Sequence, residues 1–135
     1  MTKKEVVQIL AILKAAYPNS YKMTTEEASG TINIWYMQFA NIAPDIVLMA
    51  VNKHISSNKF PPSIYEIKLI ITSIHWEAYD ALNSYGSEKL SEQAKKNYQR
   101  IYNETKNYKY EKSIAPTLQE MIGAGAQLMI GGETE

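Results

Sequence analysis

The sequence contains no cysteine, which excludes disulfide bonds, cysteine-ligated zinc and thiol catalysis. It also lacks an excess of charge of either sign, because fourteen Lys and Arg residues balance fourteen Asp and Glu residues. A protein that coats nucleic acid through charge alone needs many basic contacts to phosphates. The charge balance therefore disfavours direct nucleic-acid binding.

Long hydrophobic runs are absent as well. No stretch approaches the roughly 18 apolar residues that a membrane span needs. The apolar stretch near the N-terminus is interrupted by Gln8 and Lys14, and no small-residue cleavage site follows it. This stretch predicts an amphipathic helix rather than a signal peptide, and we expect a cytoplasmic protein without a membrane partner.

Motifs for nucleotide and metal chemistry are also missing. There is no G-x-x-x-x-G-K-[ST] phosphate loop, no G-x-G-x-x-G turn and no H-E-x-x-H zinc motif. His54 and His75 have no identifiable catalytic partners, so packing roles are favoured over a base or a metal ligand. We therefore expect no catalytic residues, no cofactor, no metal and no enzymatic activity.

What the sequence does contain is a series of amphipathic helix patterns. Three S/T-x-x-E capping boxes and a first-turn proline mark helix starts at Thr2/Glu5, Thr24/Glu27, Pro44 and Ser63/Glu66. Apolar faces at helical spacing follow: Val6, Leu10, Leu13 and Tyr17; Ala28, Ile32, Trp35, Tyr36 and Phe39; Val47, Val51, His54 and Ile55; Ile64, Ile67, Ile71, Ile74 and Ala78. The predicted fold class is all-α, a small bundle of four to five helices.

Two places in these patterns carry specific expectations. Residues 56–62 predict a rigid corner between the third and fourth helices, because Pro61 and Pro62 disfavour helical geometry at the residues before them. Phe60 is expected to plug the end of the core. Gly30 weakens the second helix by about 1 kcal/mol relative to alanine, or instead allows a neighbouring helix to approach closely.

The character of the chain changes after the fourth helix. We divide it into a helical core domain (1–82), a polar Tyr-rich segment (83–112) and a C-terminal tail (113–135). Residues 88–112 keep helical spacing with seven basic against four acidic residues, so a long helix is expected there. The tail has three acidic and no basic residues, and its glycines disfavour an isolated helix. We expect it to be disordered or to bind a partner.

Two sets of residues are candidate binding surfaces. The apolar residues of the tail suit a groove on another protein, or alternatively fold back on the core; they are Leu118, Met121, Ile122, Leu128, Met129 and Ile130. A possible nucleic-acid or partner patch comprises Lys59, Lys95, Lys96 and Arg100, with tyrosines interleaved. Neighbouring acidic residues dilute this patch, so a solvated helix face is the favoured interpretation. A small helical nucleic-acid-binding module is the alternative function.

The stretches TKKEVVQILAILKAAYPNSY, TINIWYMQF and VLMAVNKHISSNKFPPSIYEI follow one another within the first half of the chain. Their order and spacing resemble the N-terminal domain of the phage replicative-helicase loader/inhibitor family. The resemblance implies an all-helical N-terminal domain and a C-terminal part that is poorly ordered alone.

The same resemblance implies a function. A member of this family is an adaptor without enzymatic activity that binds a hexameric DnaB-type helicase in its ATP-bound form. It restrains the ATPase and unwinding activities and delivers the helicase to an origin-bound initiator protein in the bacterial host cell. The C-terminal part is expected to grip the helicase, which would place the contact in the tail. The absence of a phosphate loop agrees with an adaptor that does not itself hydrolyse ATP.

Overall fold

The computed structural model describes residues 1–84 and 87–106, and every regular element in these ranges is helical. The elements are α1 (Lys3–Ala16), α2 (Thr25–Phe39), α3 (Pro44–Ser57), α4 (Ile64–Asn83), the short 3-10 helix η1 (Ser87–Lys89) and α5 (Glu92–Thr105). The predicted all-α class is confirmed.

The predicted helix starts are confirmed in atomic detail. Thr2, Thr24 and Ser63 each accept a hydrogen bond from the backbone N–H of the glutamate three residues later. Each glutamate carboxylate accepts one in return from the backbone N–H of the capping residue. These reciprocal bonds satisfy backbone donors that a helix start leaves unpaired. Pro44 occupies the first turn of α3, as expected.

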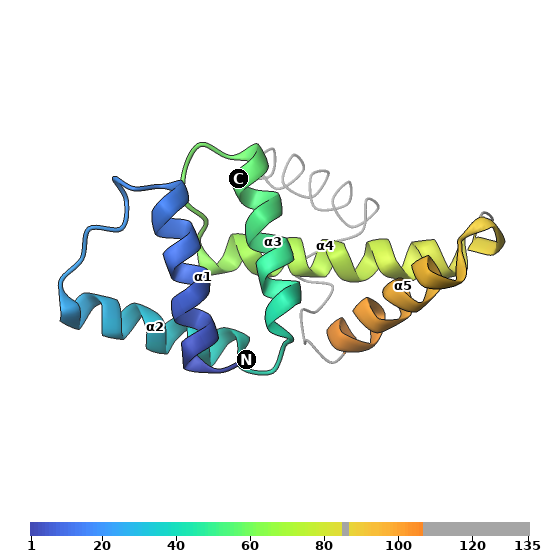
Figure 1. Cartoon of the computed structure of the whole chain (residues 1–135), viewed down its shortest axis with the longest axis horizontal. Coiled ribbons are helices and arrows are strands. Elements are labelled where there is room, and N and C mark those ends of the chain that lie inside the picture. The colour runs from blue at the N-terminus through green and yellow to red at the C-terminus, as the bar shows by residue number, and fades with distance from the viewer. Residues whose placement is uncertain (85–86, 107–135) are drawn as a thin grey trace, which may run out of the picture.

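A single core holds α1, α2, α3 and the first half of α4 together (Figure 1). It consists of Val6, Ile9, Leu13, Tyr17, Trp35, Phe39, Ile42, Ile46, Val47, Ala50, Val51, Ile67, Ile71 and Ile74. Ile9 on α1 and Ile46 and Ala50 on α3 extend the predicted faces, because α1 packs against both α2 and α3, and α3 packs against both α1 and α4. Each fully buried aliphatic side chain stabilises the fold by about 1.5–3 kcal/mol.

Helix α4 continues beyond this core, and α5 folds back along its C-terminal half to form a hairpin (Figure 1). The expectation of one helix over 88–112 is wrong at its start. Residues 87–89 form η1, and α5 begins only at Glu92, because the Ser91 side chain caps it by accepting a hydrogen bond from Ala94 N–H. At the other end α5 stops at Thr105, and residues 107–112 lie outside the described residues.

Gly30 does not serve a close approach between helices. A methyl group added at its Cα would meet no atom within 4 Å apart from its chain neighbours and the backbone of its own helix, and the residue is exposed on α2. The expectation of a close approach is therefore wrong, and only the conformational cost of glycine in a helix remains.

We predict that Gly30→Ala raises the free energy of unfolding by about 1 kcal/mol, because alanine restricts the unfolded chain and meets open space in the fold. Urea denaturation monitored by circular dichroism measures the change. Ser29→Ala at the neighbouring exposed position is the matched control and should give a smaller gain. A loss of stability in Gly30→Ala would contradict the open environment at this position.

Candidate functional site

The corner between α3 and α4 is fixed by one hydrogen bond from the end of α1 and one from the last turn of α3. The Tyr17 hydroxyl, at the end of α1, donates to the carbonyl of Asn58 at 2.9 Å. The His54 ring, on α3, lies 2.8 Å from the carbonyl of Phe60. A carbonyl only accepts, so His54 Nε2 carries the proton of this bond. Two successive parts of the corner are thus tied to two different helices.

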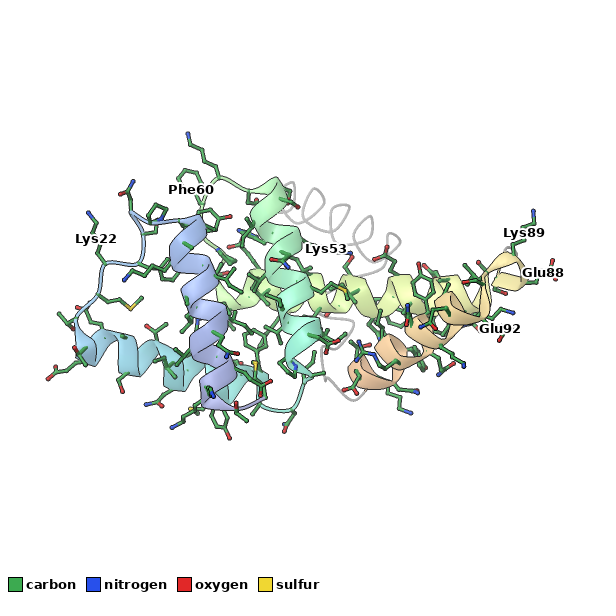
Figure 2. The ribbon with its side chains drawn as sticks, in the orientation of Figure 1. Lys22, Lys53, Phe60, Glu88, Lys89 and Glu92 are labelled. Carbon is green, nitrogen blue, oxygen red and sulfur yellow. The ribbon has the colours of Figure 1, made fainter. Side chains whose placement is uncertain are left out.

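The Phe60 side chain points away from the core that its carbonyl faces. It is 72% exposed, so the expectation that it plugs the core is wrong. The end of the core is closed instead by Tyr17, Pro62 and His54, the last only 2% exposed. The reason is that the hydrogen bond to His54 turns the backbone of Phe60 inward and its ring outward (Figure 2). The packing role expected for His54 is confirmed.

The charges near the corner are unevenly matched. The Lys59 ammonium lies 6.0 Å from the centre of the Phe60 ring, and it has no ion pair within the described residues. The nearest acid in sequence, Glu66, accepts the Ser63 N–H, and this backbone hydrogen bond lowers the pKa of the Glu66 carboxyl. Glu66 is therefore committed to its helix cap, and the corner presents a positive charge beside an exposed ring.

A second group of aromatic residues lies where α5 packs on α4. The His75 ring stacks on Tyr102 with centroids 5.1 Å apart and meets the Trp76 ring edge-on at 4.9 Å. Trp76 and Tyr79 are 43% and 41% exposed. This cluster was not predicted from the sequence, although the spacing of Trp76 and Tyr79 on one helix and the tyrosines of the following segment were visible in it.

His75 is also bonded to the last turn of α5. Its Nδ1 lies 2.7 Å from the Thr105 hydroxyl, which itself donates to the Ile101 carbonyl. The hydroxyl proton is thereby used, so His75 Nδ1–H is the donor to Thr105. Partial burial lowers the pKa of His75, because desolvation penalises the charged ring. The expected packing role of His75 agrees with this geometry.

The predicted basic residues do not form one continuous patch. Lys59 lies in the corner, whereas Lys95, Lys96 and Arg100 lie on α5. Arg100 pairs with Asp45 of α3, and Lys95 lies 3.9 Å from Glu92. These acids reduce the charge available to phosphates, which disfavours the nucleic-acid interpretation.

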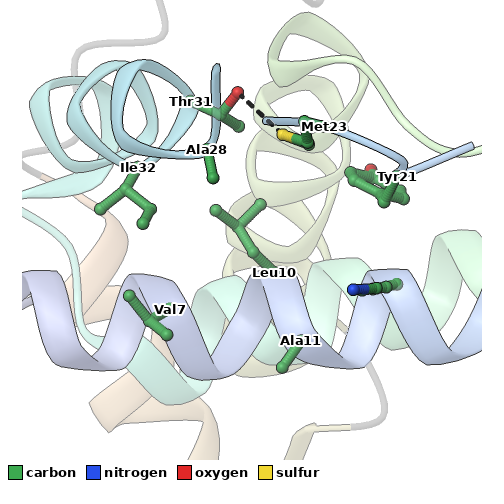
Figure 3. A pocket seen from close by; sticks show the side chains of 9 residues that line it. Val7, Leu10, Ala11, Tyr21, Met23, Ala28, Thr31 and Ile32 are labelled. Atoms are coloured by element: carbon green, nitrogen blue, oxygen red, sulfur yellow. Dashed lines mark hydrogen bonds between the residues drawn. The ribbon is translucent and has the colours of Figure 1, made fainter. Parts of the chain in front are cut away.

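An apolar groove runs between α1 and α2 (Figure 3). It has a volume of about 240 Å³ and is lined by residues such as Val7, Leu10 and Ile32. Small-molecule sites typically enclose about 300–1,000 Å³. The groove is smaller and open to solvent, and we assign it no ligand; it explains why Leu10 is only partly buried.

The remaining predicted binding residues lie outside the part of the chain that the structure describes. The apolar tail residues Leu118, Met121, Ile122, Leu128, Met129 and Ile130 lie outside the described residues. Within residues 1–84 and 87–106, no group of His, Asp or Glu side chains is arranged to hold a metal ion. None of the helices described is by itself long and apolar enough to cross a membrane, and only the sharply bent pair α2–α3 passes on combined length and composition.

Comparison with known proteins bears on the N-terminal half of the chain. The G39P_N family model, which describes the N-terminal domain of a phage helicase loader/inhibitor, matches residues 1–68. The match ends within the first turns of α4, so it includes the corner and leaves the α4–α5 hairpin outside. No curated protein and no solved structure matches the chain significantly.

Because the pKa of His75 is lowered in the fold, the free energy of unfolding should depend on pH. A lowered pKa means that the unfolded chain binds the proton more readily than the folded one. The stability that this difference provides is present above the unfolded pKa of about 6.5, and it is lost as the pH falls below that value and through the lower pKa of the folded protein. We predict that the wild type loses more stability between pH 7.5 and 5 than His75→Asn, which keeps an amide donor for Thr105 but does not titrate. Urea denaturation across this range is the measurement, and parallel profiles would contradict the assignment.

Proposed function

The chain belongs to the phage helicase loader/inhibitor family, and on this premise we propose that it is a non-enzymatic adaptor in phage DNA replication. In this proposal it acts in the cytoplasm of the bacterial host and binds a hexameric DnaB-type replicative helicase. It restrains the ATPase and unwinding activities of the helicase and delivers it to an initiator bound at the origin.

The family match over residues 1–68 is the observation that carries this proposal. It spans the three helices and the corner that form most of the core, and this core contains no candidate catalytic group. His54 and Glu66, two titratable residues at the corner, are both used in structural hydrogen bonds. A scaffold of this kind supports binding rather than chemistry.

Restraint and release of a helicase follow from differential binding. An adaptor holds a hexamer inactive only if it binds one conformational state of that hexamer better than another. A segment that becomes ordered on contact loses part of its interaction free energy to ordering. That loss suits an adaptor that must later dissociate so that the helicase can work.

We assign the helicase contact to the tail. Its apolar residues would serve as anchors in a groove of the helicase, with Met121, Ile122, Leu128 and Met129 making the main contribution. Methionine adapts its shape to an irregular groove, and the three acidic residues of the tail would favour a basic surface around that groove.

We predict that the full chain co-elutes with a DnaB-type helicase in size-exclusion chromatography with light scattering when a non-hydrolysable ATP analogue is present, and much less without nucleotide. The double variant Met121→Ser/Met129→Ser should lose this co-elution. Met37→Ser is the matched control, because Met37 is 74% exposed on α2 and outside the tail.

The possible outcomes test the adaptor function and the location of the helicase contact separately. Co-elution that is lost only in the tail variant, and also in a chain cut after Lys112, supports both the adaptor role and the tail contact. Co-elution that survives both changes keeps the role but moves the contact to residues 1–112. The absence of a complex in every nucleotide state would contradict the proposed function.

A further inference from the structure

We propose that the corner carries a second protein-binding surface, made of Lys59 and Phe60, which we call the corner surface. Its partner offers an apolar pocket with a carboxylate at the rim. The inference rests on the proposed function and deepens it, because we assign this partner to the origin-bound initiator rather than to the helicase.

The exposure of Phe60 is the first observation. Its ring is 72% exposed. Burying a phenylalanine contributes about 1.5–3 kcal/mol, and the fold leaves this contribution unused at Phe60. Aromatic side chains are enriched among the few residues that dominate binding energy at protein interfaces. A partner pocket that accepts the ring would recover the missing burial.

The rigidity of the corner is the second observation, and it separates Phe60 from an ordinary exposed side chain. The Asn58 carbonyl is held by Tyr17, and the Phe60 carbonyl is held by His54, with distances of 2.9 and 2.8 Å. Pro61 and Pro62 fix the backbone that follows, and Pro62 is buried. Binding through this corner would therefore lose little conformational entropy, and such pre-organisation increases affinity.

The charge beside the ring defines the chemistry of the partner. Lys59 has no ion pair in the part of the chain that the structure describes, in contrast to Lys53, which pairs with Glu77 at 3.1 Å. Glu66 is occupied by the Ser63 cap. A partner carboxylate next to the pocket would thus find an available ammonium group, and complementary charge favours the correct register and faster association.

The proposed function gives the reason to assign this surface to the initiator. An adaptor that delivers one protein to another must contact both. We assign the helicase contact to the tail, whereas the corner lies within the part of the chain that the family model matches. The corner surface is therefore left for the second partner.

The test uses full-length protein and the initiator that binds the phage origin, with affinity measured by titration calorimetry. We expect Phe60→Ala to weaken initiator binding by at least about tenfold, and Lys59→Glu to weaken it as well. The matched controls are Met37→Ala, which removes an equally exposed apolar side chain, and Lys22→Glu, which reverses an exposed charge away from the corner (Figure 2). Both controls should bind as the wild type does.

Folding and function are checked on the same variants. Phe60→Ala should melt within a few degrees of the wild type, because the ring is mostly solvated, and it should still co-elute with the ATP-bound helicase. Unchanged initiator binding in Phe60→Ala, or a loss confined to the helicase, overturns the inference. Wild-type protein that binds the helicase but not the initiator also overturns it and leaves the proposed function standing. Wild-type protein that binds neither the helicase nor the initiator would contradict both this inference and the proposed function.

Discussion

The hydrogen bond from the buried His54 ring to the Phe60 carbonyl is the constraint on which the shape of the core most depends. A buried polar ring needs a partner, since leaving its N–H unsatisfied costs about 1–3 kcal/mol. The Phe60 carbonyl of the α3–α4 connector meets this need, so the backbone of Phe60 faces inward. Pro62 then enters the core, and the Phe60 ring is left in solvent.

The same connector sets the start of α4 and therefore the arrangement of everything after it. Ser63 caps α4 immediately beyond the two prolines, and α4 then runs through the core and out of it. Its buried residues stop at Ala78, so its last turn is stabilised by α5 instead. The bond between His75 and Thr105 and the ion pair between Arg100 and Asp45 tie α5 back to the core. The molecule thus combines a compact N-terminal core with a hairpin joined to it through one shared helix.

Local signals in the sequence were sufficient for the helices but not for the ends of the core. The three capping boxes were predictable because the reciprocal bonds join residues only three positions apart. The orientation of Phe60 was not, because it depends on how the connector folds back: the His54 ring at the end of α3 meets the Phe60 carbonyl, and Tyr17 at the end of α1 holds the Asn58 carbonyl. Gly30 was ambiguous for the same reason, since the space around its Cα is set by neighbouring elements.

In the C-terminal half, too, local sequence signals predicted a helix but not where it begins or what it contacts. The spacing of apolar residues indicated a helix after the break, but the Ser91 cap decides its start, and that cap carries no glutamate at the third position to mark it. The ring cluster of His75, Trp76 and Tyr102 arises only when α5 folds back on α4. The family resemblance indicated from the first half of the sequence was confirmed by the match to residues 1–68. The assigned tail contacts stay a proposal.

The central claim is that the core holds the corner rigid while Phe60 remains in solvent, and nuclear magnetic resonance relaxation of the backbone amides of Asn58, Lys59, Phe60 and Ser63 tests it most directly. We predict order parameters near 0.85, the value typical of a rigid backbone, equal to those of the flanking turns of α3 and α4. Values below about 0.6 at Lys59 and Phe60 would show a mobile loop and would contradict the view that the corner is a pre-organised surface.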